Sequence, residues 1–245
     1  MNIDLTGRIA VVTGATGELG RVITRTLSDC GARVAAHYHQ AADKAGELSA
    51  ACIVQADVTL EEGVLRMRDE IHRKLGVPDI IVNNAVIQYT WTNVLRQSPA
   101  DYRSQFESCV LQNVHMAQAF VPGMIEKKWG RVIAINTECA MQNAPGQSAY
   151  VSGKRGMDGV LRCLAKEVGG HGVTVNQVAP GWMISEKSRA EGTERQEQYE
   201  RNIPLRRRGE DQDIANAVAF LASDLAGFIS GVYLPVCGGN VMPGI

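Results

Sequence analysis

Two residues of the sequence, Tyr150 and Lys154, have the types and the spacing of a proton-transfer pair. A separation of four residues places both side chains on one face of a helix. An ammonium group on that face stabilises a phenolate and lowers the pKa of the phenol from about 10 towards neutrality. A tyrosine tuned in this way acts as a general acid or base near physiological pH.

A hydroxyl residue, Thr137, lies thirteen residues before Tyr150, just past the apolar run RVIAIN (131–136). The run is predicted to be a buried strand. Residues at the carboxyl ends of parallel strands line the ligand crevice of such sheets. The pattern therefore predicts a hydroxyl, a phenol and an ammonium in one crevice.

The segment TGATGELG (13–20) predicts the phosphate-binding turn of a dinucleotide site, because Gly14, Gly17 and Gly20 lie between a buried strand and a helix. Glycine permits a positive φ at the tight turn and lets backbone N–H groups approach a pyrophosphate. The N-terminus of the helix adds its partial positive charge. Glu18, in the first helical turn, is expected to point to solvent and to favour the helix dipole.

The end of the second strand, AAHYHQ (35–40), bears on which dinucleotide binds. A carboxylate there would bond the adenosine ribose and repel a 2′-phosphate. Tyr38 occupies that place instead, and His37 and His39 beside it can donate hydrogen bonds to a phosphate. We therefore predict NADP, with NAD as the alternative, and we expect Asp57, from ADV (56–58), to lie near the adenine.

The rest of the chain alternates short apolar runs with helical patterns, which predicts a parallel sheet covered by helices on both faces. The predicted strands are 8–13, 33–38, 52–56, 79–85, 131–136 and 173–179, and the predicted helices are 18–29, 41–50, 61–75, 99–126 and 148–169. The fold class is α/β, with residues 1–245 forming a single doubly wound Rossmann domain of three α/β/α layers. The polar stretch 185–202 is either a solvated helix and loop or, as 182–202, a mobile lid.

Composition restricts the partners. Of 245 residues, 45% are hydrophobic and 21% charged, and the net charge is −1, so nothing favours nucleic acid or a membrane. The six cysteines form no Cys-x-x-Cys pair, and we expect no metal site. The N-terminal MNIDLTGR is not an apolar signal sequence, and the expected location is cytoplasmic.

In their order and spacing, VVTGATGELG (11–20), NNA (83–85), AYVSGK (149–154), VNQVAPG (175–181) and ISGVYLPVCGG (229–239) resemble the short-chain dehydrogenase/reductase family. The resemblance implies that Tyr150 is the general acid/base and that Lys154 holds the nicotinamide ribose. It implies further that Thr137 replaces the serine that bonds the substrate carbonyl, and that Asn113 holds a water in a proton relay. Thr137 and Val86, in NNAV, depart from the usual pattern.

The residue patterns and the resemblance together imply contacts with the cofactor along the turns and strand ends. These are Gly14, Thr16, Gly17, Glu18, Leu19, His37, Tyr38, His39, Asp57, Val58, Asn84, Ala85, Tyr150, Lys154, Pro180, Gly181, Met183 and Ser185.

The activity that these residues imply is NADP(H)-dependent reduction of a ketone to a secondary alcohol. Chain length and IPLRRRGEDQDIANAVAFLAS (203–223) most resemble 3-oxoacyl-[acyl-carrier-protein] reductases, which implies a 3-oxoacyl thioester substrate, with Lys127 and Lys128 near the acidic carrier. The alternatives are a dehydrogenase of sugars, polyols or other small alcohols, and a catalytically silent dinucleotide-binding redox sensor.

The resemblance also implies a homo-oligomer, a dimer or tetramer, that pairs through the helix bearing Tyr150 and the C-terminal segment. An apolar stripe runs along that helix (Met157, Leu161, Leu164 and Val168), and it fits either such an interface or burial against the sheet.

Overall fold

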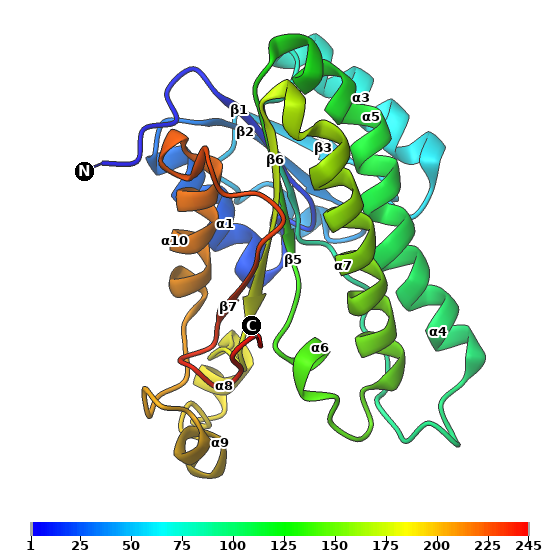
Figure 1. Cartoon of the computed structure of the whole chain (residues 1–245), viewed down its shortest axis with the longest axis vertical. Coiled ribbons are helices and arrows are strands. Elements are labelled where there is room, and N and C mark those ends of the chain that lie inside the picture. Colours follow the sequence, from blue (N-terminus) through cyan, green and yellow to red (C-terminus); the bar gives the residue numbers. More distant parts are fainter. Residues whose placement is uncertain (1, 245) are drawn as a thin grey trace.

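A computed structural model describes residues 2–244, which form a parallel sheet between two layers of helices (Figure 1). The strands are β1 (Ile9–Val12), β2 (Arg33–Tyr38), β3 (Cys52–Gln55), β4 (Ile80–Asn83), β5 (Gly130–Ile135), β6 (Val173–Pro180) and β7 (Tyr233–Val236). Their order is β3-β2-β1-β4-β5-β6-β7, and each neighbouring pair is parallel. The predicted single Rossmann-like α/β domain is confirmed.

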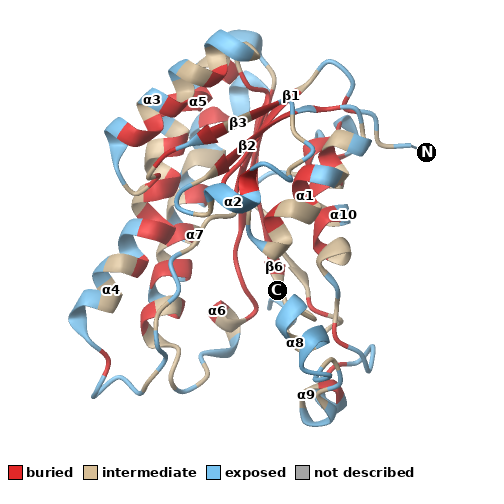
Figure 2. Cartoon of the chain, turned by 180° about the vertical axis from the view of Figure 1, so that it is seen from behind, coloured by how far each residue is buried: buried red, intermediate tan, exposed pale blue. Residues whose placement is uncertain are grey.

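Two hydrophobic cores flank the sheet because successive strand residues face opposite layers. Val11 and Ile81 pack into the core beneath α3 (Glu61–Lys74), α5 (Gln112–Lys127) and α7 (Ser148–Val168). Val12 and Val82 pack into the core beneath α1 (Glu18–Asp29) and α10 (Asp211–Ala222). The buried residues of these helices face the sheet in Figure 2.

The apolar stripe on α7 belongs to the first of these cores. Met157, Leu161 and Val168 are each no more than 5% exposed, and Leu164 packs against them. Of the two interpretations of the stripe, burial against the sheet is therefore the one that the structure supports.

The strand order places the ligand crevice. The chain passes from β1 outward through β2 and β3, then returns to the other side of β1 and continues through β4 to β7. The connections that leave the carboxyl ends of β1 and β4 therefore run in opposite directions, and open α/β sheets bind their ligands at such a point. The buried hydroxyl of Thr13 bridges this point, accepting hydrogen bonds from the backbone N–H groups of Asn84 and Ala85 at 2.9 and 3.0 Å.

The shorter elements lie mainly around that crevice. They are α2 (Ala42–Ala45), α4 (Pro99–Gln105), a π-helix (Phe106–Leu111), α6 (Cys139–Gln142), α8 (Glu186–Ala190), α9 (Glu197–Asn202) and 3₁₀ turns at Gly169–His171 and Asp224–Ala226. None of the helices in the described part of the chain combines the length and apolar character that a membrane crossing requires.

Several boundaries differ from the sequence prediction. Only Ala42–Ala45 of the predicted helix 41–50 is helical, and the predicted helix 99–126 is divided by the π-helix. Two elements were not predicted, β7 and α10. Strand β7 contains Pro235 and is partly exposed along its length, as a proline-bearing edge strand can be.

Candidate active site

A cavity of about 650 Å³ lies at the carboxyl ends of β1, β4, β5 and β6 and contains most of the predicted site residues. Those that line it are Gly14, Thr16, Gly17, Glu18, Leu19, His37, His39, Asp57, Val58, Asn84, Ala85, Thr137, Tyr150, Lys154, Pro180 and Gly181. Four predicted residues are not in its wall: Tyr38, Asn113, Met183 and Ser185. Ser108 and Gln112 line it without having been predicted as site residues.

Tyr150 and Lys154 lie on one face of α7, as the spacing predicts. The Nζ atom of Lys154 lies 5.8 Å from the centre of the Tyr150 ring and donates a hydrogen bond to the carbonyl of Ile135 at 2.6 Å. Lys154 is 4% exposed, and burial lowers its pKa.

The expected lowering of the Tyr150 pKa is not found in this structure. Burial of the phenol raises its pKa, and a hydrogen bond from the Thr137 hydroxyl only partly opposes the rise. The physical reason is that desolvation penalises the phenolate, while the ammonium of Lys154 is directed to the Ile135 carbonyl. Tyr150 is therefore protonated at neutral pH in this structure.

Thr137 is fixed at the end of β5 from two directions. Its hydroxyl accepts a hydrogen bond from the Cys139 N–H at 3.2 Å, and its carbonyl accepts one from the Tyr233 hydroxyl. The side chain is 7% exposed and lines the same cavity as Tyr150. A substrate oxygen in that cavity can thus meet a phenol and a secondary hydroxyl.

Asn113 lies behind the cavity wall. Its Nδ2 donates to the Cys109 carbonyl of the π-helix at 2.7 Å, and its Oδ1 accepts from Asn83 Nδ2 at 2.7 Å. The amide braces β4 against the π-helix. Its predicted role in a water relay stays a prediction.

The glycine turn has the geometry of a phosphate cradle. Gly14 has φ +64°, and a Cβ on Gly20 would lie 2.2 Å from the Gly14 carbonyl oxygen, so both positions require glycine. Gly17 is the N-cap of α1, and no side chain among the described residues caps it. The N–H groups of the first turn are open to an anion, and the residues present fit the pyrophosphate of a dinucleotide.

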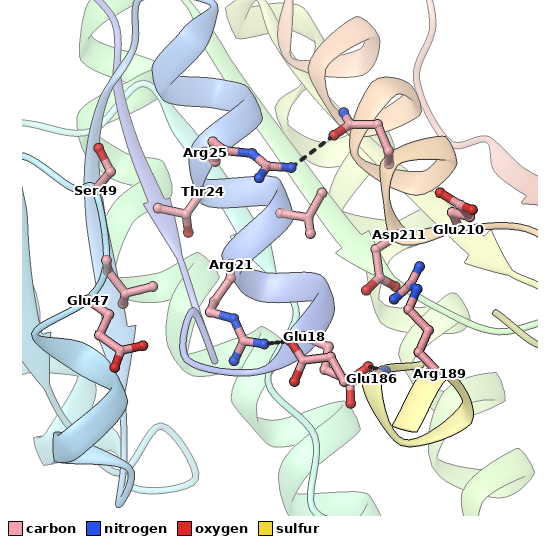
Figure 3. A pocket seen from close by; sticks show the side chains of 13 residues that line it. Glu18, Arg21, Thr24, Arg25, Glu47, Ser49, Glu186, Arg189, Glu210 and Asp211 are labelled. Atoms are coloured by element: carbon pink, nitrogen blue, oxygen red, sulfur yellow. Dashed lines mark hydrogen bonds and ion pairs between the residues drawn. The ribbon is translucent and has the colours of Figure 1, made fainter. Parts of the chain in front are cut away.

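Glu18 differs from the expectation that it would point to solvent. Its Oε2 accepts a hydrogen bond from the Glu186 N–H at 2.6 Å, and Arg21 pairs with the Glu186 carboxylate while donating to the Thr16 carbonyl at 2.9 Å. Glu18 thus contacts the start of α8 across a second cavity of about 410 Å³, shown in Figure 3. The Glu186 N–H has no acceptor within α8, because it lies at the N-terminus of that helix, and it therefore binds the Glu18 carboxylate in place of water.

His37 is also placed differently from the prediction, because it cannot donate to a phosphate. It is 1% exposed; its Nδ1 accepts from the Gly14 N–H at 3.1 Å, and its Nε2 lies 3.0 Å from the Ala56 carbonyl. Burial lowers the pKa of the ring to about 4, which keeps it neutral. The histidine supports the glycine turn. Of the predicted phosphate donors, only His39 is half-exposed at the rim, where its Nε2 lies 3.9 Å from the Asp57 carboxylate.

Beside Thr137, Glu138 takes part in a hydrogen-bond network that no sequence motif indicated. Glu138 is 3% exposed; its carboxylate accepts from the Tyr199 hydroxyl at 2.6 Å and from Asn240 Nδ2 at 3.0 Å. The Tyr199 oxygen accepts in turn from the Trp182 N–H at 2.8 Å. This network joins α9 and the C-terminal segment to the end of β5.

Arg208, 2% exposed, organises the other end of the 182–202 insertion. Its guanidinium donates to the backbone carbonyls of the segment 182–194 (Trp182, Met183, Thr193 and Glu194) and lies 4.7 Å over the Trp182 ring. No sequence signal distinguished it from Arg206 and Arg207. Met183 faces a neighbouring cavity, and Ser185 caps α8 by accepting from the Ser188 N–H at 3.0 Å.

Lys127 does not lie near the cavity of its own chain. Its Nζ donates to the Val77 carbonyl and to Asp79, 2.7 and 2.9 Å away, just before β4 begins. That is the amino end of the sheet, opposite the cavity. The interpretation of Lys127 as a docking residue for this cavity is therefore wrong.

A parallel α/β sheet, a glycine cradle at the first βα turn and a Thr–Tyr–Lys set at the strand ends define a dinucleotide-dependent oxidoreductase. The sequence profile of the family described as enoyl-(acyl carrier protein) reductase matches residues 14–240. The chain belongs to this short-chain dehydrogenase/reductase family, as the sequence resemblance indicated, and it is an oxidoreductase of carbonyl/alcohol pairs.

Similar proteins are matched over nearly their whole length. The 3-oxoacyl-[acyl-carrier-protein] reductase of Haemophilus influenzae is 36% identical over 240 residues, which cover 95% of this chain and 98% of that protein. The enzymes of that name from Staphylococcus epidermidis and Pseudomonas aeruginosa are 36% and 35% identical, over 95% and 98% of this chain and 98% and 100% of theirs.

Proposed function

We propose that the protein reduces 3-oxoacyl thioesters to 3-hydroxyacyl thioesters with NADPH, using Tyr150 as the general acid. The observation that carries the proposal is the shared cavity of Thr137, Tyr150 and Lys154, which continues into the glycine cradle. The names of the similar reductases supply the substrate class.

Each residue has a defined task in this reaction. The nicotinamide, when bound, supplies a hydride to the substrate carbon. Thr137 donates a hydrogen bond to the carbonyl oxygen and orients it, and Tyr150 transfers its proton to the same oxygen as negative charge develops there. Lys154 holds the ribose, and its ammonium, which bonds the Ile135 carbonyl in this structure, stabilises the phenolate of Tyr150 once it turns towards that ring. The product is a secondary alcohol, and Tyr150 recovers a proton from solvent.

The preference for NADPH is supported by the end of β2, where Tyr38 replaces the carboxylate that would repel a 2′-phosphate. His39 at the rim supplies the donor. His39→Asp is expected to weaken NADPH binding at least roughly tenfold and to spare NADH, because a carboxylate at the rim repels the 2′-phosphate. Equal binding of NADPH and NADH by the unaltered protein would contradict the preference.

The proposal is tested by following NADPH oxidation with an acetoacetyl thioester. Tyr150→Phe should lower kcat by roughly 10²- to 10⁴-fold with NADPH binding unchanged, because only the proton donor is lost. Parallel assays with sugars, polyols, small ketones and a 2-enoyl thioester test the alternatives, the last because of the family's description. Tight NADPH binding with no turnover of any of them would indicate the silent redox sensor.

A homo-oligomer, dimer or tetramer, stays a prediction. Sedimentation equilibrium of the purified chain tests it, and a 26.5 kDa species at micromolar concentration would contradict it.

A further inference from the structure

The residues that follow β4 form a loop, residues 86–97, that reaches the catalytic helix. We call it the clamp loop. Its first part, Val86 to Gln88, lines the cavity, and its next part contacts the N-terminal turn of α7. Nothing in the chemistry described above uses that second contact.

The contact is made to Tyr150 itself. The Tyr89 hydroxyl oxygen accepts a hydrogen bond from the backbone N–H of Tyr150 at 2.8 Å. The Trp91 ring stacks on the Tyr150 ring, with centroids 5.9 Å apart and an interplanar angle of 26°. The backbone and the ring of Tyr150 are thus held by two side chains of one loop.

The start of α7 needs such a partner. Tyr150 is the third residue of the helix, so its N–H has no acceptor within the helix. The N-cap residue, Gln147, provides no side-chain hydrogen bond. The acceptor comes instead from a residue sixty-one positions earlier in the chain, in place of the local Ser, Thr or Asp that usually caps a helix.

The clamp loop is itself fixed by two buried glutamines. Gln105, 0% exposed, donates to the Ile87 carbonyl at 2.8 Å. Gln97, 7% exposed, accepts from the Thr92 N–H at 3.0 Å and donates to the Thr90 carbonyl at 3.2 Å. Tyr89 and Trp91 therefore project from a braced segment and can hold Tyr150 in one position.

We propose that Tyr89 is a positioning residue for the reaction: its hydroxyl caps the Tyr150 N–H and, with Trp91, sets the phenol where it meets the substrate oxygen. The inference rests on the proposed function for its kinetic consequence only.

The test is Tyr89→Phe, which removes one hydroxyl and keeps the ring. Its matched control is Tyr102→Phe, because the Tyr102 hydroxyl bonds the Ser148 hydroxyl at the same helix end, 2.6 Å away, but not Tyr150. Amide hydrogen exchange of Tyr150 is measured in both variants, without cofactor or substrate. In Tyr89→Phe the exchange should accelerate roughly 5- to 50-fold, as expected for loss of one hydrogen bond to a partly buried donor, and in the control less than about twofold.

The kinetic measurement separates positioning from general stability. Tyr89→Phe should lower kcat for ketone reduction by a similar factor of roughly 5- to 50-fold, with KM and the NADPH Kd within about twofold. Unchanged exchange at Tyr150, equal acceleration in both variants, or a rise in KM at constant kcat would overturn the inference. Amide exchange needs no turnover, so it tests the hydrogen bond between Tyr89 and Tyr150 even in an inactive protein. Absence of any reductase activity would therefore refute the proposed function alone.

Discussion

The carboxylate of Glu18 accepts a hydrogen bond from the backbone N–H of Glu186, 2.6 Å away and 168 residues later in the chain. Glu18 belongs to the first turn of the phosphate cradle, and Glu186 begins α8, the first helix of the 182–202 insertion. The acidic side chain of Glu18 can lie beside a phosphate site because it is turned towards the N-terminus of α8, whose N–H groups carry a partial positive charge.

The same carboxylate affects Asp211 across the cavity of Figure 3. Burial raises the pKa of Asp211 to about 6, and the charge of Glu18 adds to the rise. Glu18→Gln, which keeps an acceptor for Glu186 but removes the charge, should lower the pKa of Asp211. The measurement is a carboxyl NMR titration. Glu47→Gln is the matched control from the same cavity, and an unaltered Asp211 pKa in Glu18→Gln would contradict the coupling.

His37 should make the stability of the protein depend on pH. Its pKa is about 4 in the folded chain against 6.5 as its ordinary value, so between these values the unfolded chain binds more protons. The free energy of unfolding should therefore fall as pH is lowered from 6.5 to 4, by about 3 kcal/mol in the limit.

Urea denaturation of the unaltered chain and of His37→Asn between pH 4 and 8 measures this effect. Asparagine keeps an acceptor for the Gly14 N–H and does not titrate. The difference between the two curves should shrink towards low pH; a constant difference would show that His37 does not stay neutral. Asp211, whose raised pKa acts in the opposite direction, cancels in the difference.

The cofactor-free protein should contain no tyrosinate from Tyr150 at neutral pH, because burial raises the pKa of the phenol. Ultraviolet difference spectra between the unaltered chain and Tyr150→Phe, taken from pH 7 to 9, measure it. A tyrosinate band in this range that the variant lacks would mean that the charge of Lys154 outweighs burial in setting the pKa of Tyr150.

Tyr199 should hold the insertion against the cavity. Tyr199→Phe removes the donor to Glu138 and the acceptor of the Trp182 N–H together. The expected loss is roughly 1.5–3 kcal/mol of unfolding free energy, as for a hydrogen bond to a charged group, with faster tryptic cleavage in the 187–195 segment. Tyr38→Phe is the control, since the Tyr38 hydroxyl makes no hydrogen bond among the described residues. Cleavage at the same rate in both variants would show that the Tyr199 hydroxyl does not hold the insertion.

Much of this site follows from the order of the chain. The glycine turn and Thr137 could be placed together because each follows a recognisable strand, and parallel strands bring their carboxyl ends to one edge. Tyr150 and Lys154 could be paired with each other because a spacing of four residues puts both on one face of a helix. The strands themselves were recognisable as apolar runs, with β2 predicted to the residue. Periodicity and motif spacing therefore suffice for the fold and for the meeting of Thr137, Tyr150 and Lys154 in one cavity, while their catalytic roles stay predictions.

The direction in which side chains turn could not be predicted in the same way. His37 was expected to face a phosphate and instead faces the Gly14 N–H and the Ala56 carbonyl, because a strand residue next to a tight turn meets unpaired backbone groups. Tyr89 capping α7 and Arg208 binding the carbonyls of 182–194 depend on loops brought together only by the folded chain. No local pattern carries that information.

The π-helical turn Phe106–Leu111 has a consequence for how the sequence can change in length. A π turn contains one residue more than the α turn it replaces, so α4 and α5 are out of phase by about 100° relative to an uninterrupted helix. With this offset α4 contacts α7 while α5 covers the sheet. Deleting one residue from 106–111 would turn one of these faces away from its partner. We therefore expect insertions and deletions to be far less tolerated here than in the exposed stretch 190–195.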